Sequence, residues 1–362
     1  MAGSPAGRRG GYGTSVTKRL DLTREQILGY RRVVGALDER LPPGAGSLRT
    51  AAWAGLQDSM PRAALLSIHA RVEGTRPDTW ADPALVQVWG PRFSAYAVSA
   101  EDRAIFTLGR LPEDAAGLKR AVGTADRLEA FLDGRRMSYA EAGRGLGIPP
   151  NALRYAAPTG RVLIHWDGAR PPTVWTVPQP DVEPREARNE LARRFLHAFG
   201  PSTPTGLANW AGIKPPRARA AFEDLARELT PVHTPIGDAW ILTGDEAGFG
   251  TAEPARTDAV RLLPSGDTWY LLQGIERELL VPDAAHRGLL WTSRVWPGAL
   301  LVGGETVGTW RRAGETVSIQ PWRRLTARER EATETEAASL PLPGLAGRIH
   351  VRWDAEATAS TS

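Results

Sequence analysis

The tripeptide Gln57-Asp58-Ser59 places three polar side chains in a row between two apolar segments. The amide of Gln57 can donate and accept hydrogen bonds, the carboxylate of Asp58 can supply negative charge, and the hydroxyl of Ser59 can hold a water molecule. Asp and Ser just before Pro61 are also ordinary capping residues for a helix that opens at that proline. The residues alone favour the helix cap, so a chemical role needs support from the rest of the chain.

The other reactive side chains exclude several kinds of chemistry. The sequence has no cysteine, which excludes disulfides, thiol nucleophiles and cysteine-based metal sites. Its six histidines are scattered without HxH or HExxH spacing, so we expect no metal site and no cofactor. Only three lysines occur, and none is next to the tripeptide: Lys18, Lys119 and Lys214.

Length and composition are typical of a globular protein with several modules. The 362 residues exceed what one simple core usually supports, so we expect about two to four modules. No run approaches the roughly 18 apolar residues of a membrane span, and the N-terminus lacks the apolar segment of a secretory signal. We therefore expect a cytoplasmic protein without membrane contact. The net charge of +4 comes mainly from arginine, which phosphate binding and GC-rich codon usage explain about equally well.

The apolar periodicity predicts a block of helices followed by a hairpin near the N-terminus. We expect three helices and then two strands around a tight turn, at 23–39, 48–57, 61–72 and 86–99. Thr23 is a plausible N-cap of the first helix. Three helices followed by a hairpin are typical of a winged helix, which we assign to residues 20–112, after a flexible basic tail at 1–19.

A second block repeats this order. A helical pattern at 115–132 is followed at 138–160 by a helix, a Gly-rich turn and a second helix, and then by two apolar strands within 161–178. Ser138 begins a capping box. This pattern predicts a second winged-helix unit at 113–182.

A third block has the strongest helix-turn-helix pattern of the chain. Helices are expected at 186–199 and within 203–230, with Thr203 as an N-cap, and a hairpin follows at 232–243. We assign a third winged-helix unit to residues 183–250.

The C-terminal part is rich in β-strand patterns, with a final helix at 327–340. It predicts a β-barrel-like domain at 251–354, followed by a tail at 355–362. The expected fold class is therefore α+β, with three tandem winged-helix units plus a C-terminal β-barrel-like domain.

Four segments stand out, in this order along the chain: GLQDSMPRAALLSIHARV (55–72), VWGPRFSAYAVSAED (88–102), FLHAFGPSTPTGLANWAGI (195–213), and LLPSGDTWYLL (262–272) with LLVGGETVGTWRR (300–312). Together they resemble the winged-helix DNA glycosylases of the AlkZ and YcaQ type. The resemblance spans roughly residues 20–340. It implies an enzyme that excises a damaged purine base from DNA.

The resemblance also implies which residues act. In that family a Gln, and a second Gln or Asp two positions later, stabilise the positively charged sugar of the transition state and position a water molecule. These positions are Gln57 and Ser59 here, so Gln57 matches the family and Ser59 departs from it. The middle position is usually apolar in the family and is Asp58 here. We predict that Asp58 supplies the negative charge missing at Ser59, although neighbouring side chains point in different directions.

The expected substrate follows from the same departure. An altered water-positioning pair should narrow activity, so we favour bulky N7-alkylguanine adducts over small 7-methylguanine, in self-resistance to a genotoxic natural product. No lysine lies beside the motif, so we expect a monofunctional enzyme that leaves an abasic site. The expected partner is double-stranded DNA containing alkylated guanine, bound by a nucleoid-associated monomer because the repeats are internal.

Five arginines are expected to contact DNA, although each can equally be a solvated surface residue: Arg92, Arg154, Arg161, Arg217 and Arg219. Trp89 and Trp296 are expected in the core. Two alternatives remain at this point. A non-catalytic winged-helix regulator predicts base-sequence readout without a product, and a protein scaffold predicts weak, salt-insensitive interaction with DNA.

Overall fold

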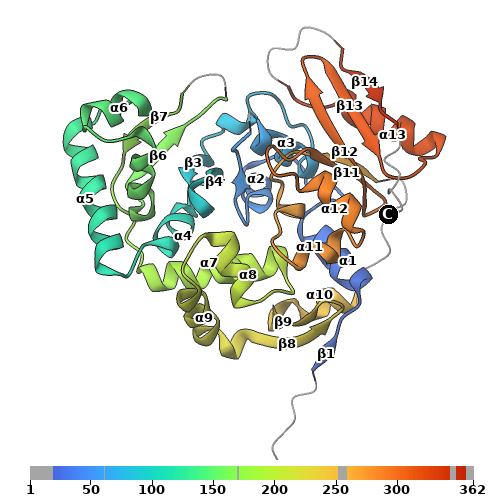
Figure 1. Cartoon of the computed structure of the whole chain (residues 1–362), viewed down its shortest axis with the longest axis horizontal. Coiled ribbons are helices and arrows are strands. Elements are labelled where there is room, and N and C mark those ends of the chain that lie inside the picture. The colour runs from blue at the N-terminus through green and yellow to red at the C-terminus, as the bar shows by residue number, and fades with distance from the viewer. Residues whose placement is uncertain (1–18, 61, 169–170, 252–258, 343–347, 356–362) are drawn as a thin grey trace, which may run out of the picture.

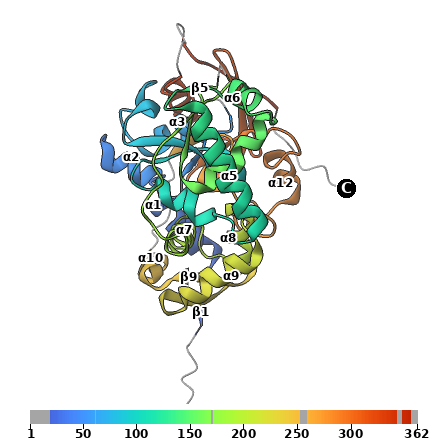
Figure 2. The same ribbon diagram turned by 90° about the vertical axis from the view of Figure 1, so that its left-hand side faces the viewer.

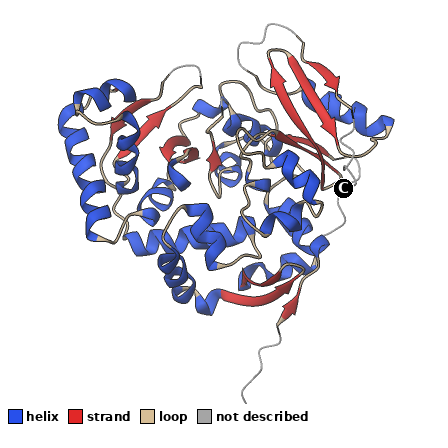
Figure 3. Ribbon diagram, viewed as in Figure 1, coloured by secondary structure: helices blue, strands red, loops and turns tan. Residues whose placement is uncertain are grey.

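The computed structural model describes residues 19–60, 62–168, 171–251, 259–342 and 348–355. Pro61, Lys18 and most of the two expected tails lie outside the described residues. Within these ranges the architecture is mixed α+β, as expected, with helices through the middle and along the left-hand edge of the view and the C-terminal sheet at the upper right (Figure 3). No described helix combines the length and the apolar character needed to cross a bilayer.

The first block contains α1 (Arg24–Val34), α2 (Ala45–Ala51), α3 (Ala63–Arg71) and the antiparallel strands β3 (Leu85–Trp89) and β4 (Ala95–Ser99). Thr23 caps α1 in a capping box, as predicted. The expected helix at 48–57 is wrong in its second half, because α2 ends at Ala51 and β2 (Leu56–Gln57) pairs antiparallel with β4. Gly55, at φ 70°, turns the chain from helix to strand in a left-handed conformation that glycine adopts easily.

The second block contains α5 (Ala115–Leu132), β5 (Met137–Ser138), α6 (Tyr139–Gly145), β6 (Val162–His165) and β7 (Thr173–Thr176). Ser138 forms the predicted capping box at the start of α6. The second helix expected within 138–160 is instead a 3-10 stretch, Pro150–Thr159. Pro158 lies inside this stretch and lacks the backbone N–H that a regular α-helix would use, which favours the irregular conformation.

The first two hairpins form one sheet rather than two separate wings. The strand order is β2-β4-β3-β6-β7-β5, and Gln87 of β3 lies opposite Ile164 of β6. The short helix α4 (Arg103–Thr107) follows β4, and α5 covers one side of the second block (Figures 1 and 2). The motif strand β2 is therefore the edge of a sheet that both blocks share.

The third block contains helices α7 (Pro184–Phe199), α8 (Pro204–Ala211) and α9 (Pro215–Asp224), then strands β8 (Leu229–Thr234) and β9 (Gly237–Leu242). Thr203 caps α8, as predicted, and Gly212 ends it at φ 68°. The N-terminal strand β1 (Leu20–Asp21) pairs in parallel with β8, so the chain start packs on the third block rather than on the first. The short helix α10 (Glu246–Gly250) follows β9.

The C-terminal region is an open sheet, not the expected barrel. Its strands run in the order β10 (Val260–Leu263), β11 (Gly298–Val302), β12 (Glu305–Ala313), β13 (Thr316–Pro321) and β14 (His350–Trp353). Among the described residues β10 and β14 each pair with one neighbour only, so the two edges do not close on each other. Three helices accompany the sheet: α11 (Glu276–Leu280), α12 (Ala284–Leu290) and α13 (Ala327–Ala338).

One cluster of buried apolar residues joins all these regions. It extends from Leu28 in α1 through Phe195 in α7 to Trp322 after β13. Burial of this surface holds the blocks against one another, since apolar burial contributes about 25 cal/mol per Å². Loops from the first block and from the C-terminal region consequently meet in one place, where the tripeptide lies.

Candidate catalytic pocket

The strand conformation of β2 sends the three motif side chains in two directions. Gln57 pairs with Tyr96 of β4, and the backbone N–H of Asp58 donates to the carbonyl of Ala95 at 2.7 Å. Because successive side chains of an extended segment point to opposite faces, Gln57 and Ser59 are half-buried and line a pocket, whereas Asp58 is buried on the other side. The motif therefore has a half-buried pair that faces the pocket and a buried middle residue.

The pocket shared by Gln57 and Ser59 has a volume of about 230 Å³. Four chain segments build it: the β2–α3 connection, the β3–β4 turn, the stretch after β10, and the loop before β11. We call it the Gln57 pocket, and its lining residues are Gln57, Ser59, Met60, Arg92, Ser265, Gly266, Leu271, Gln273, Arg294, Val295 and Trp296. These described residues include two arginines and no acidic side chain, so the pocket is electropositive.

The amide of Gln57 is held between Arg92 and Gly266. The guanidinium Nη2 of Arg92 donates to Gln57 Oε1 at 3.4 Å, near the upper limit of a hydrogen bond. A Cβ added to Gly266, which has φ +78°, would lie 3.2 Å from Cδ and 3.3 Å from Nε2 of Gln57. Only a residue without a side chain allows the backbone to approach the amide this closely.

The β3–β4 turn presents Arg92 to the pocket in an unusual backbone conformation. Arg92 and Phe93 have φ values of 54° and 58°, which side chains larger than glycine adopt rarely. Such conformations cost roughly 1–3 kcal/mol each and persist where the surroundings enforce them. Here the backbone of Arg92 packs against Gly212 at the end of α8, where a Cβ would lie 3.0 Å from its Cα. The third block thus supports the turn that carries Arg92.

Asp58 is the centre of a buried hydrogen-bond network. Its Oδ1 accepts from the backbone N–H of Ala64 at 3.0 Å, and its Oδ2 accepts from Nε2 of Gln87 at 2.6 Å. Gln87 in turn accepts from the backbone N–H of Trp166 at 2.6 Å through Oε1. Burial raises the pKa of Asp58 to about 6, although the hydrogen bonds from Ala64 and Gln87 lower it. Asp58 therefore satisfies an N-terminal N–H of α3 and ties the motif to the second block.

The five arginines expected to contact DNA have different surroundings. Arg92 lies in the Gln57 pocket, and Arg219 is exposed on α9. Arg161 forms ion pairs with Asp126 and Glu129. The remaining two are more enclosed. Arg217 is 8% exposed and donates to the carbonyl of Leu111 at 2.8 Å, and Arg154 is half-buried. Their contacts with DNA stay predictions.

Sequence reasoning missed the C-terminal contribution to the pocket. Ser265, Gln273 and Arg294 line it. Ser265 lies within the segment 262–272 that carries part of the resemblance, but no motif marks Gln273 or Arg294. Trp296, expected in the core, packs partly against it but also lines the pocket, with the guanidinium of Arg277 at 5.4 Å from its ring. Trp89 is buried, as expected. A half-buried wall of this kind depends on contacts between segments more than 200 positions apart.

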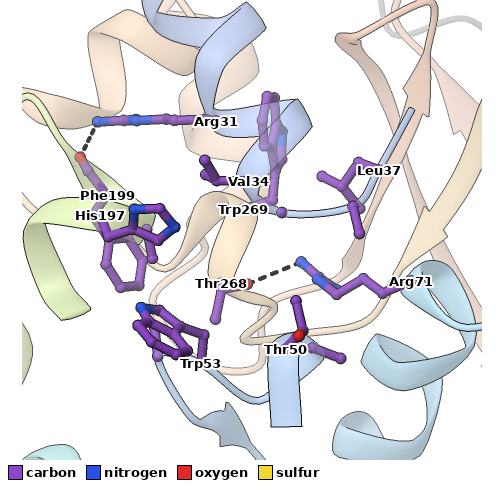
Figure 4. Close-up of a pocket in the computed structure, with 15 residues that line it drawn as sticks. Arg31, Val34, Leu37, Thr50, Trp53, Arg71, His197, Phe199, Thr268 and Trp269 are labelled. Carbon is purple, nitrogen blue, oxygen red and sulfur yellow. Dashed lines mark hydrogen bonds between the residues drawn. The ribbon is translucent and has the colours of Figure 1, made fainter. Parts of the chain in front are cut away.

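A second, smaller cavity of about 30 Å³ lies between α1, α2, α7 and the stretch before Tyr270, and contains none of the motif residues. Figure 4 shows Arg31 bound to the carbonyl of Phe199, and Arg71 bound to the hydroxyl of Thr268, on its two sides. It has space for about one or two water molecules. In the described residues no group of three or more His, Asp or Glu side chains is arranged to hold a metal ion.

The chain belongs to the AlkZ-like DNA glycosylase family. The model of that family, described as DNA glycosylase AlkZ-like, matches residues 50–341, which include Gln57, Arg92 and the C-terminal wall of the pocket. The solved structure of the DNA glycosylase AlkZ from Streptomyces sahachiroi is similar over 92% of this chain and 100% of that chain, with a TM-score of 0.73 and 19% identity. This similarity shows that the two proteins share a fold. No curated protein sequence matches the chain.

Proposed function

We propose that this chain is a monofunctional DNA glycosylase that hydrolyses the N-glycosidic bond of bulky N7-alkylguanine adducts in duplex DNA, in self-resistance to a genotoxic natural product. One observation carries the proposal. Gln57 and Ser59 line the same pocket, where their amide and hydroxyl groups can hold a water molecule, and no described residue of that pocket is acidic.

The release of an N7-alkylated guanine needs no general acid, and the described pocket residues supply none. The base is already cationic, so when the N9–C1′ bond breaks, the bonding electrons neutralise it and no protein acid is required. Water oxygen then bonds to C1′, and its proton passes to solvent. Gln57 and Ser59 can hold that water from one side, because an amide and a hydroxyl both donate and accept. A normal purine is a poorer leaving group and would need a general acid that the described pocket residues do not supply.

Asp58 acts, in this proposal, mainly by position. Its carboxylate is directed to Ala64 and Gln87 rather than to the pocket. It fixes the N-terminus of α3 against β2 and so keeps Gln57 and Ser59 facing the pocket. The charge role predicted from the sequence requires the carboxylate to act on the sugar through the protein interior. Comparison of Asp58→Asn with Asp58→Ala tests the two roles.

Duplex DNA is proposed to bind to the three helix–hairpin blocks, acting as winged helices. Arg92 and Arg219 are the first candidates for phosphate contacts, since one lies in the pocket and the other is exposed. Arg161 and Arg217 must exchange carboxylate partners for phosphates, so they are expected to contribute less. Arg154 requires a side-chain rearrangement, since its Nε is buried.

The monofunctional character rests on the lysines. Neither Lys119 nor Lys214 lines the Gln57 pocket, and Lys214 pairs with Asp114 on the surface. Since no lysine of the described residues lies beside the sugar in this proposal, we expect no Schiff base and an intact strand. The product is then an abasic site. One copy of the chain is proposed to suffice, because the three helix–hairpin blocks are repeated within one chain.

The deciding experiment uses duplexes that carry one defined N7-guanine lesion, either a bulky aromatic adduct or a methyl group. Incubation with the protein, followed by alkaline cleavage, should give strand breaks at the lesion, with faster release of the bulky adduct. Samples without alkali should stay uncut. Strand cleavage without alkali would contradict the monofunctional assignment, and equal or faster release of 7-methylguanine would contradict the substrate preference.

A further inference from the structure

Two exposed apolar side chains stand at the rim of the Gln57 pocket. Met60 is 36% exposed and Val295 is 47% exposed, and both line the pocket. They come from opposite parts of the sequence, Met60 directly after the motif and Val295 in the loop between α12 and β11. Within the described residues neither belongs to a hydrophobic core cluster, whereas the neighbouring Trp296 packs against the main core. Stability therefore does not explain why these two positions are apolar.

The loop that carries Val295 is ordered by its own hydrogen bonds. The carbonyl of Val295 accepts from the hydroxyl of Thr292 at 3.0 Å and from Nη2 of Arg311 at 3.1 Å. The guanidinium of Arg277 lies over the ring of Trp296, 5.4 Å from its centre. The side chain of Val295 is thus presented on a supported backbone, which lowers the entropy lost when a ligand contacts it.

The size of the pocket determines what can lie inside it. Sites that bury a drug-sized ligand usually measure about 300–1,000 Å³, and this pocket measures about 230 Å³. A guanine with a bulky substituent cannot be enclosed there as a whole. The substituent must cross the rim, where Met60 and Val295 are exposed.

We propose that Met60 and Val295 form an apolar lip that contacts the ring system of a bulky adduct outside the pocket and so selects it over a small alkyl group. The inference rests on the proposed function and names the residues that decide its substrate class. The polar residues of the pocket act on the sugar and the water, which all substrates share. The lip acts on the substituent, which differs between substrates.

The test compares the native protein with the double variant Met60→Ala/Val295→Ala. Affinity and single-turnover base release are both measured on duplexes carrying either an N7-guanine adduct with a polycyclic aromatic group or N7-methylguanine. The native protein should prefer the aromatic adduct in both measurements. In the double variant, the ratio of aromatic to methyl adduct in each measurement should fall about tenfold, since apolar burial contributes about 25 cal/mol per Å². Leu118→Ala/Val122→Ala on α5 is a matched control, because these side chains are similarly exposed, at 37% and 39%.

Each outcome decides the proposal. An unchanged ratio between the two duplexes overturns the lip, as does a native protein without any preference for the aromatic adduct. A lost binding preference without base release from either duplex supports the lip and contradicts the proposed glycosylase chemistry. Base release with an unchanged ratio supports the glycosylase and overturns the lip. Thermal unfolding of both double variants checks that their folds are intact.

Discussion

The Gln57 pocket and a larger groove of this molecule differ in size and in how their charged side chains are paired. The larger, of about 1030 Å³, lies between α3 and α13 and is lined among others by Arg40, His69, Arg261 and Glu336; we call it the α3–α13 groove. Arg40 binds both carboxylate oxygens of Glu336 at 2.8 Å, and Arg261 donates to the carbonyl of Ala70 at 3.0 Å. Burial lowers the pKa of His69 to about 4, so this histidine is neutral near pH 7.

The Gln57 pocket is smaller and its charges are not compensated. Neither Arg92 nor Arg294 pairs with a carboxylate in the described residues, and the one contact of Arg92 with the motif is long. A binding site for a polyanion needs charges that are free to meet phosphates, whereas paired charges mainly hold a fold together. The comparison teaches that charge pairing identifies the candidate site better than volume does.

The largest expected effect is on the chemical step in the Gln57 pocket. Gln57→Ala should lower base release under single-turnover conditions by about 100- to 1000-fold, the range for removal of one well-placed polar group from a transition state. The matched variant Glu336→Gln, in the α3–α13 groove, should leave the rate of the folded enzyme unchanged. A wild-type rate in Gln57→Ala would remove this residue from the chemistry.

The second effect concerns Asp58, behind the pocket. Its pKa in the folded protein is about 6, above the ordinary value of 3.8, so the folded state holds the proton more tightly. The contribution of protonated Asp58 to the free energy of unfolding is complete below about pH 4. It is lost as pH rises through about 6, by up to about 3 kcal/mol. Asp58→Asn cannot titrate, so its free energy of unfolding relative to the native protein should rise over this window.

Urea unfolding at several pH values between 4 and 7 measures this difference. Asp78→Asn serves as a control, since that side chain is 72% exposed. A difference between Asp58→Asn and the native protein that stays constant over the window would show that Asp58 does not titrate there. Base release by the same variant then separates position from charge, since Asn retains an acceptor for Ala64 but carries no charge.

Sequence patterns predicted the local features of this fold and missed the long-range ones. Thr23, Ser138 and Thr203 were identifiable as caps because a cap depends on residues three positions away. The strand at Leu56–Gln57 was not, since it forms only by pairing with β4, about forty positions later. Helical periodicity continued past Ala51 in the sequence, whereas in the structure α2 ends at Ala51 and Gly55 turns the chain into β2.

The candidate site shows the same limit. Gln57 was identifiable through its motif, and Arg92 through its place in a hairpin turn. Ser265, Gln273 and Trp296 reach the pocket only because the C-terminal sheet packs against the first block. The expected barrel failed for a related reason, since closure requires pairing of β10 with β14, and no local pattern specifies that contact.

Two arginine variants, one in the Gln57 pocket and one in the α3–α13 groove, test whether unpaired charges serve DNA binding and paired charges serve stability. Arg92→Ala should lower DNA affinity and base release about tenfold, because a guanidinium meeting phosphate is lost, and should change the melting temperature little. Arg40→Ala should do the opposite. It leaves the buried Glu336 without its partner and should destabilise the fold by about 2 kcal/mol, while base release per folded molecule is retained. Reversal of either effect would contradict the assignment of charges to function and to stability.

The smallest effect probes the contact between Gly266 and the Gln57 amide. Gly266→Ala adds a Cβ within 3.2 Å of Gln57 Cδ at a backbone φ of +78°, so it should both strain the backbone by about 1 kcal/mol and displace the amide. Gly314→Ala is the matched control, because it has φ +58° with nothing within 4 Å of the added atom. The two variants should lose similar stability, and only Gly266→Ala should release the base several-fold more slowly. Equal base release by both would mean that the amide of Gln57 tolerates displacement. The pocket would then depend on the presence of this side chain rather than on its exact placement.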